Sequence, residues 1–296
     1  MAAPYTWPVK PFDRQHPVRG FFGDPRIAGG GRTFHFGIDI AAPAGTPVYA
    51  VAPGKVSYGS PGDVAQNGGI VVVEAAGRNF GYWHVAPAVK PGTRVRLHGL
   101  LGYVAAQPED WGHVHFAEST HSTKGTTYWN PLRRGAITPF FDYGPPVIDA
   151  IVTSLPPQAL RGLVDLSVNA HDNTPIEVTQ AKPPGWHGMP VTPALIRWRL
   201  TRAQQPILPW QVAVDHRGSI KPDVQGSPPS DVNFGAVYAP DSTQNHPDVP
   251  GVFHFWLERG LDTGRYPDGE YLLEVEVSDV RGNPNTRSLV LTFANS

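Results

Sequence analysis

The sequence predicts an all-β protein with two domains. Its 296 residues exceed the usual size of a single domain. It contains 32 glycines and 33 prolines without a collagen-like period, which indicates short strands joined by tight turns. No long segment has the hydrophobic period of a helix. We therefore expect two β-rich cores.

The first domain is predicted to be a compact antiparallel β-sheet domain at residues 1–144, with its core at about 30–120. Short apolar segments separated by Gly, Pro, Asn and Asp follow one another from Thr33 to Phe116. The Pro-rich segment 139–146 is typical of a linker, because proline lacks a backbone donor and restricts the residue before it. We place the domain boundary near residue 144.

The second domain, residues 145–296, is predicted to be an immunoglobulin-like or fibronectin-III-like β-sandwich. Apolar residues alternate along one of its strands, at Tyr271, Leu273, Val275 and Val277, and a Gly-Asn turn then leads to a similar strand. About seven such strands are typical of this sandwich. The Pro-rich segments between them predict long loops.

Composition narrows the function classes. The chain has no cysteine, so a metal site must use His, Asp or Glu ligands. The formal net charge is -1, with 13 basic against 9 acidic residues in 1–144 and 11 against 16 in 145–296. The sequence has no concentrated basic patch, which argues against a nucleic-acid partner. We expect no transmembrane segment, because no stretch approaches roughly 20 apolar residues, and the start does not resemble a signal peptide.

A His and an Asp lie four residues apart in the segment TFHFGIDI, at His35 and Asp39. In a straight strand they would share a face but stand about 13 Å apart, too far to bind one metal. Gly37 lies between them and permits a sharp bend. Without a bend, the pair is the solvated face of an edge strand.

Two further elements contain histidine. In GHVHF, His113 and His115 are two residues apart and point to the same side of a strand, while their neighbours point into a core. In YWHV, His84 interrupts an apolar strand. Taken alone, the first is equally typical of a surface strand, and a lone histidine is more often structural.

Together and in this order, the three elements resemble the M23 (LytM/lysostaphin-like) family of zinc metallopeptidases, which has an HxxxD motif, a later histidine and an HxH motif. The surrounding segments HFGIDIAAPAGTPVYAVAPGKVSYG, GIVVVEAAGRNFGYWHV and KPGTRVRLHGLLGYV also resemble the family. The likeness covers about residues 30–120.

The resemblance implies a zinc site and its chemistry. His35, Asp39 and His115 would hold Zn²⁺, with water in the fourth position. His113 would be the general base toward that water. His84 would stabilise the oxyanion or protonate the leaving amine, two tasks that the sequence does not apportion.

Several residues near these motifs leave alternatives open. The family has small residues before HxH, whereas this chain has QPEDWG, so Glu109, Asp110 and Trp111 are expected at the groove wall and leave the substrate preference open. Glu118 is more typical of a surface position than of a partner to a ligand. In the N-terminal segment, Asp13 or His16 either reaches the zinc or belongs to a strap packed on the domain.

The leading hypothesis is a zinc-dependent endopeptidase that hydrolyses peptide bonds of bacterial peptidoglycan, with its stem or bridge peptides as partners. We expect it to be monomeric and secreted, periplasmic or cell-wall associated. The alternative is a non-catalytic LytM-like module that binds zinc, regulates a partner or binds the wall. The sandwich is expected to act as a spacer or wall-positioning domain, with carbohydrate binding through its tryptophans as the other option.

Overall fold

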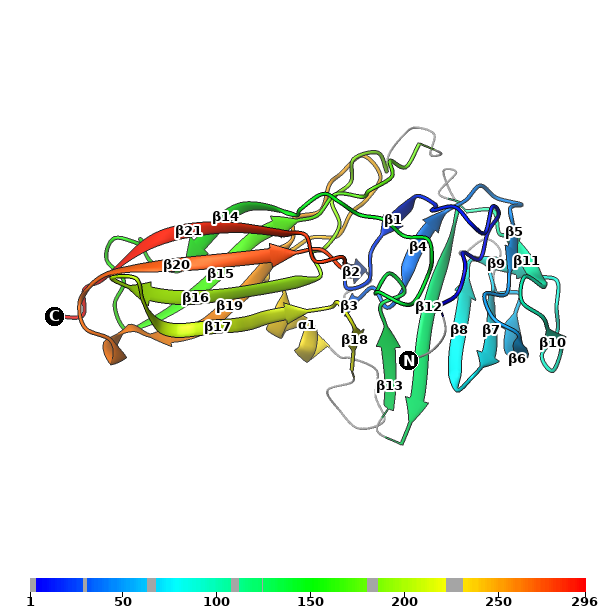
Figure 1. Cartoon of the computed structure of the whole chain (residues 1–296), viewed down its shortest axis with the longest axis horizontal. Coiled ribbons are helices and arrows are strands. Elements are labelled where there is room, and N and C mark those ends of the chain that lie inside the picture. Colours follow the sequence, from blue (N-terminus) through cyan, green and yellow to red (C-terminus); the bar gives the residue numbers. More distant parts are fainter. Residues whose placement is uncertain are drawn as a thin grey trace.

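The computed structural model describes residues 4–28, 31–62, 68–107, 112–123, 125–179, 186–221 and 231–296. Strands dominate these ranges, as the sequence predicts (Figure 1). The described helical elements are short: α1 (Asp231–Val237) and the 3-10 turn η3 (Thr263–Arg265). No helix in the described ranges has the length and apolar character needed to cross a membrane.

A nine-stranded antiparallel sheet, counted over the described ranges, forms the main layer of the first half. The alternating apolar segments pair as predicted, and the buried valines Val56, Val71 and Val73 contribute to the core beneath them. The main path of the sheet has the order β1 (Val18–Gly20), β4 (Ile38–Ala41), β12 (His113–Ser122), β8 (Arg78–Trp83), β7 (Ile70–Ala75), β6 (Gly54–Ser60) and β10 (Arg94–Val95). The other two strands, β13 (Gly125–Trp129) and β18 (Ser219–Ile220), branch from β12.

Smaller sheets complete the first half. One has the order β5 (Pro47–Tyr49), β11 (Leu100–Val104) and β9 (Val85–Pro87). The other is the hairpin of β2 (Pro25–Ala28) and β3 (Gly31–Phe34). This hairpin lies beside the second half of the chain in Figure 1, so the chain next to the HxxxD motif faces both halves.

Two antiparallel sheets build the second half, and their facing side chains form one core. The alternation at Tyr271, Leu273, Val275 and Val277 is confirmed, because each of these side chains is buried. One sheet has the order β14 (Val147–Thr153), β15 (Leu163–His171) and β19 (His254–Asp262), and the other β17 (Gln205–Asp215), β16 (Leu195–Arg202), β20 (Gly269–Ser278) and β21 (Pro284–Phe293). The arrangement is consistent with a β-sandwich.

The two halves are joined by strand pairing and by shared core residues. Strand β18 (Ser219–Ile220) comes from the second half but pairs with β13 (Gly125–Trp129), which continues the main sheet from β12. Phe22 and Phe34 come from the first half but pack in the core of the second. The chain also changes core at the bend around Gly37: Phe34 packs on the second half, whereas Ile38 and Ile40 pack on the first.

The N-terminal segment is a strap packed on the first half. Trp7 and Val9 are buried in its core, and the indole of Trp7 donates to the carbonyl of Pro139 at 2.7 Å. His16 lies against Trp7, with its ring 2.9 Å from the carbonyl oxygen of Pro11. The option that His16 reaches a metal is not supported by these contacts, which belong to the strap.

Glu118 is fully buried, so the expectation of a surface position is wrong. Its carboxylate accepts hydrogen bonds from Tyr5 at 2.8 Å and from Arg133 at 2.6 and 2.9 Å, and it also pairs with Arg78. Two guanidinium groups compensate the cost of burying one carboxylate. Glu118 therefore ties the N-terminal strap to β12.

Candidate metal centre

The HxxxD motif bends where the sequence predicts a bend. The chain leaves the β2–β3 hairpin after Phe34, bends over residues 35–37 and enters the main sheet at Ile38 as β4. The register of β4 on β12 then places Asp39 directly opposite His115. The bend and the register together bring one side chain from each motif to one point.

Gly37 is required by the close packing of this bend against β12. A Cβ there would lie 2.4 Å from the carbonyl oxygen of Phe116 and 2.8 Å from Nε2 of His115. Gly37 is not among the residues with positive φ. At this bend the glycine therefore supplies space for β12 rather than a left-handed backbone conformation.

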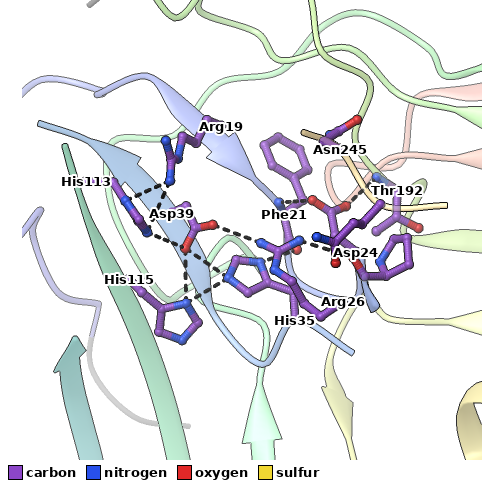
Figure 2. A network of polar contacts seen from close by, with 12 residues as sticks. Arg19, Phe21, Asp24, Arg26, His35, Asp39, His113, His115, Thr192 and Asn245 are labelled. Atoms are coloured by element: carbon purple, nitrogen blue, oxygen red, sulfur yellow. Dashed lines mark hydrogen bonds and ion pairs between the residues drawn. The ribbon is translucent and has the colours of Figure 1, made fainter. Parts of the chain in front are cut away.

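The potential ligand atoms of the three side chains lie within hydrogen-bonding distance of one another (Figure 2). His35 Nε2 is 2.8 Å from His115 Nδ1 and 3.0 Å from Asp39 Oδ1, and the latter two atoms are 3.1 Å apart. Ligands of a tetrahedral zinc ion with bonds of about 2.0–2.1 Å lie about 3.3 Å apart. Two imidazole nitrogens and one carboxylate oxygen are also ligands that zinc accepts. The group therefore fits a zinc ion after a small outward movement.

The protonation of these groups also suits a metal. His35 Nδ1 lies 2.8 Å from the carbonyl oxygen of Phe21, and because a carbonyl can only accept, Nδ1 carries the proton and Nε2 keeps a lone pair. Burial, followed by the nearby charge of Arg26, lowers the pKa of His35 to about 3. Burial raises the pKa of Asp39, but the surrounding imidazoles outweigh it and hold that pKa well below its usual value. A neutral imidazole and an ionised carboxylate are the forms that bind metal.

The two other predicted histidines lie beside this group. His113 Nε2 is 3.6 Å from Asp39 Oδ1, and the rings of His113 and His84 are 4.3 Å apart between centroids. His84 has a φ of 63°, which is uncommon for a residue with a side chain, and its carbonyl accepts from Ala105 at 2.8 Å. The structure thus brings all five predicted residues to one site.

Two arginines that sequence reasoning missed complete the site. Arg19, on β1, is buried and places Nη2 2.8 Å from His113 Nδ1. Arg26, on β2, donates to Asp39 Oδ2 at 2.9 Å, which leaves Oδ1 toward the two imidazoles. Figure 2 shows the guanidinium groups on either side of Asp39. No motif marks these arginines, because a single basic residue in a strand carries no sequence signal.

The second half of the chain also lines the site. A cavity of about 390 Å³ contains all five predicted side chains and both arginines, and its other lining residues include Trp186 and the segment 244–247. Trp186 stacks on the guanidinium of Arg19 at 4.2 Å. Residues 108–111 lie outside the described residues, and with them Glu109, Asp110 and Trp111, which the sequence places at the groove wall.

A Ser–His–Asp chain of hydrogen bonds occurs in the second half. His254 lies 2.8 Å from the hydroxyl of Ser167 and 2.7 Å from the carboxylate of Asp241. Both Ser167 and His254 are buried, and neither lines a cavity described here. Without access for a substrate, this chain of contacts is structural.

An antiparallel β domain with two imidazoles, a carboxylate and two further imidazoles in one cleft defines a candidate metallohydrolase. Residues 33–127 match the model of Peptidase family M23. No curated protein sequence matches the chain. The sequence resemblance, drawn over about 30–120, is confirmed.

Comparison with solved structures gives partial matches. A zinc-containing peptidase from Vibrio cholerae is 25% identical, with 40% of this chain and 36% of that chain covered and a TM-score of 0.33. A variant of the catalytic domain of the prophage-encoded M23 protein EnpA from Enterococcus faecalis is 27% identical, with 45% and 98% covered and a TM-score of 0.33. A chain of the SpoIIQ–SpoIIIAH pore-forming complex is 21% identical, with 40% and 85% covered and a TM-score of 0.33.

Proposed function

We propose that this protein is a zinc-dependent endopeptidase that hydrolyses peptide bonds of bacterial peptidoglycan. The observation that carries the proposal is the convergence of His35, Asp39 and His115, whose ligand atoms are 2.8 to 3.1 Å apart, in a domain that matches an M23 peptidase family. The match to the family supports peptidase chemistry. Peptidoglycan as substrate, and a location outside the cytoplasm or at the cell wall, are proposals that follow from the family resemblance.

In this mechanism His35, Asp39 and His115 hold the zinc ion. When bound, zinc makes a water more acidic and polarises the scissile carbonyl. Arg26 holds Oδ2 of Asp39, and the carbonyl of Phe21 holds His35 from behind. These contacts fix the ligands in one orientation before metal arrives, which lowers the cost of assembling the site.

His113 and His84 are the groups that hold and move protons. Because Arg19 can only donate, its contact with His113 Nδ1 leaves the proton of a neutral His113 on Nε2. His113 is then set to donate a hydrogen bond to an oxyanion, and His84 is the imidazole that can take a proton. The family resemblance implies the opposite assignment, with His113 as the general base and His84 at the oxyanion or the leaving amine.

The Arg19 contact also favours a second candidate function. If His113 Nδ1 stays paired with Arg19 and no base acts in its place, the site binds zinc without hydrolysis. The protein would then be a non-catalytic zinc-binding module that binds or regulates a partner in the wall. We also propose a domain boundary near residue 144, with the two halves in extensive contact.

Zinc analysis and peptide release separate these functions. Zinc per chain would be measured on the wild type and on His115→Ala, and peptide release from purified peptidoglycan assayed in parallel. One zinc per chain with release that His115→Ala abolishes supports the endopeptidase. One zinc without release from several wall types supports the binding module. Absence of zinc after addition of the metal overturns both.

A further inference from the structure

Two cavities of different character flank the proposed zinc ligands. The larger, about 390 Å³, is lined mostly by charged and polar residues and is called the polar cavity below. The smaller, about 260 Å³, lies beside it, and His35, His115 and Arg26 line both. The smaller cavity has an aromatic lining, given by Phe34, Phe36, Trp83 and Tyr128. A peptide that passes the metal therefore meets a polar surface on one side and an aromatic surface on the other.

The wall of the polar cavity from the second half is a braced loop. The backbones of His246 and Val249 exchange two hydrogen bonds of 3.0 Å, and Thr243 donates to Val252 at 2.9 Å. The side chain of Asn245 donates to the carbonyl of Pro190 at 2.6 Å and accepts from Gly251 at 2.7 Å. We call residues 243–252 the wall loop. Its bracing makes it a preformed surface, which a specificity-determining element requires.

Gln244 fixes the wall loop to the first half next to the site. Its side-chain oxygen accepts a hydrogen bond of 2.5 Å from the backbone of Ile27, the neighbour of Arg26. The amide nitrogen of Gln244 lies 3.4 Å from Nε2 of His246, so one of its two N–H groups is directed at that ring and the other is left to donate to another group. The exposed His246 lies two residues further along and also lines the cavity.

The charges of the polar cavity favour an anion. Among its described lining residues, Arg19 and Arg26 are cationic and Asp39 is the single acid. Asp39 is already paired with Arg26 at 2.9 Å, so it offsets the charge of one arginine. Two arginines against one acid leave the cavity positive with or without zinc, and its wall adds N–H groups of Gln244 and His246.

We propose that the second domain forms part of the substrate cleft, and that the polar cavity under the wall loop is a subsite for a carboxylate-bearing residue of the peptide. His246 and Gln244 are its specificity-determining residues. This inference rests on the proposed function and names the substrate class: an acidic peptide with an uncharged residue on the aromatic side of the metal. The M23 domain by itself would lack this subsite.

Binding tests the inference separately from catalysis. Two stem peptides would be compared, identical except that a side-chain carboxylate next to the candidate scissile bond is free in one and amidated in the other. Their affinity for the full-length His115→Ala protein, which leaves the peptide uncut, would be measured by calorimetry. We expect about tenfold tighter binding of the acidic peptide, because hydrogen bonds to charged groups are the stronger ones.

The wall loop is tested in the same His115→Ala background. His246→Ala is expected to weaken binding of the acidic peptide about fivefold and to narrow its preference over the amidated one. His171→Ala, at a half-buried histidine of the second half that lines neither cavity, is the control and should leave both affinities unchanged.

Each outcome bears on one claim. Equal affinity for the two peptides, or equal effects of His246→Ala and His171→Ala, overturns the subsite. The preference in binding together with a wild type that cuts no peptide supports the subsite and overturns the endopeptidase. Cleavage by the wild type without a binding preference for the acidic peptide supports the endopeptidase and overturns the subsite.

Discussion

The backbone N–H of Thr192 donates a hydrogen bond of 2.8 Å to the carboxylate of Asp24, across the junction between the two halves. The other carboxylate oxygen of Asp24 accepts from the backbone of Phe21 at 2.7 Å, and the carbonyl of Phe21 holds His35. Tyr238 adds a second contact across the junction, to the carbonyl of Gly23 at 2.8 Å. The turn that orients a proposed zinc ligand is thus held by the second half (Figure 2).

Asp24→Ala is expected to weaken zinc binding about tenfold, because the turn behind His35 loses its central acceptor and partners of metal ligands contribute at this level. It leaves two buried N–H groups unpaired and lowers the free energy of unfolding by about 1–3 kcal/mol. Competition with a chelator measures the zinc affinity. Asp13→Ala, at an exposed carboxylate of the strap, is the control. Equal zinc affinity of the two variants would contradict the linkage.

Gly37→Ala is expected to abolish zinc binding while the chain still folds. The added methyl group would lie 2.4 Å from the Phe116 carbonyl oxygen and 2.8 Å from His115, so the bend or the imidazole must move. Such overpacking costs about 1–3 kcal/mol of stability. Zinc content and thermal unfolding are the measurements. Gly235→Ala, in α1 with open space around it, should leave zinc content unchanged, and one zinc per chain in Gly37→Ala would refute the steric argument.

The candidate metal site could be predicted from the sequence because the residues that form it are close in sequence or are placed opposite one another by strand register. His35 and Asp39 are separated by one bend at a glycine, and the HxH spacing places both imidazoles on one face of β12. The alternation in 271–278 fixes one face of a strand because burial requires it. Such local patterns are the ones that strand geometry imposes on a sequence.

Contacts between segments that are distant in the sequence leave no local pattern and could not be predicted. The guanidinium of Arg19 and the ring of Trp186 meet at 4.2 Å although the two residues lie in different halves of the chain, and neither belongs to a motif. The burial of Glu118 could not be predicted because its hydrogen-bond partner Tyr5 lies 113 positions away in the sequence. The packing of Phe34 on the second half could not be predicted either, because it depends on how the two halves dock.

Glu118→Gln is expected to lower the free energy of unfolding by about 3–5 kcal/mol, because removal of one partner from a buried ion cluster leaves the others uncompensated. Arg78 and Arg133 would then lose their common anion. Chemical denaturation measures the change. Glu274→Gln, which breaks a surface pair with Arg199, should have a far smaller effect. If both variants lose the same stability, Glu118 is not a buried anchor.

His216 is expected to make stability depend on pH. It is buried against Phe22 and Phe34 at the junction of the halves, and burial lowers its pKa to about 4 from an ordinary value of 6.5. Between pH 6.5 and 4 the imidazole is therefore protonated in the unfolded chain but neutral in the folded chain. The contribution of His216 to the free energy of unfolding is complete above pH 6.5 and is lost as the pH falls toward 4. The loss amounts to about 3 kcal/mol.

Denaturation of the wild type and of His216→Phe from pH 4 to 8, both in chelator, isolates this contribution. Phenylalanine keeps an aromatic ring among the same neighbours but does not titrate. The other titrating groups, including the junction carboxylate Asp24, are common to both proteins and cancel in the difference. The wild type should lose about 3 kcal/mol more than the variant between pH 6.5 and 4. If the free energies of unfolding of the two proteins fall in parallel with pH, His216 must be protonated in the folded chain. Its burial argues against this, because Nδ1 has no hydrogen-bond partner among the described residues.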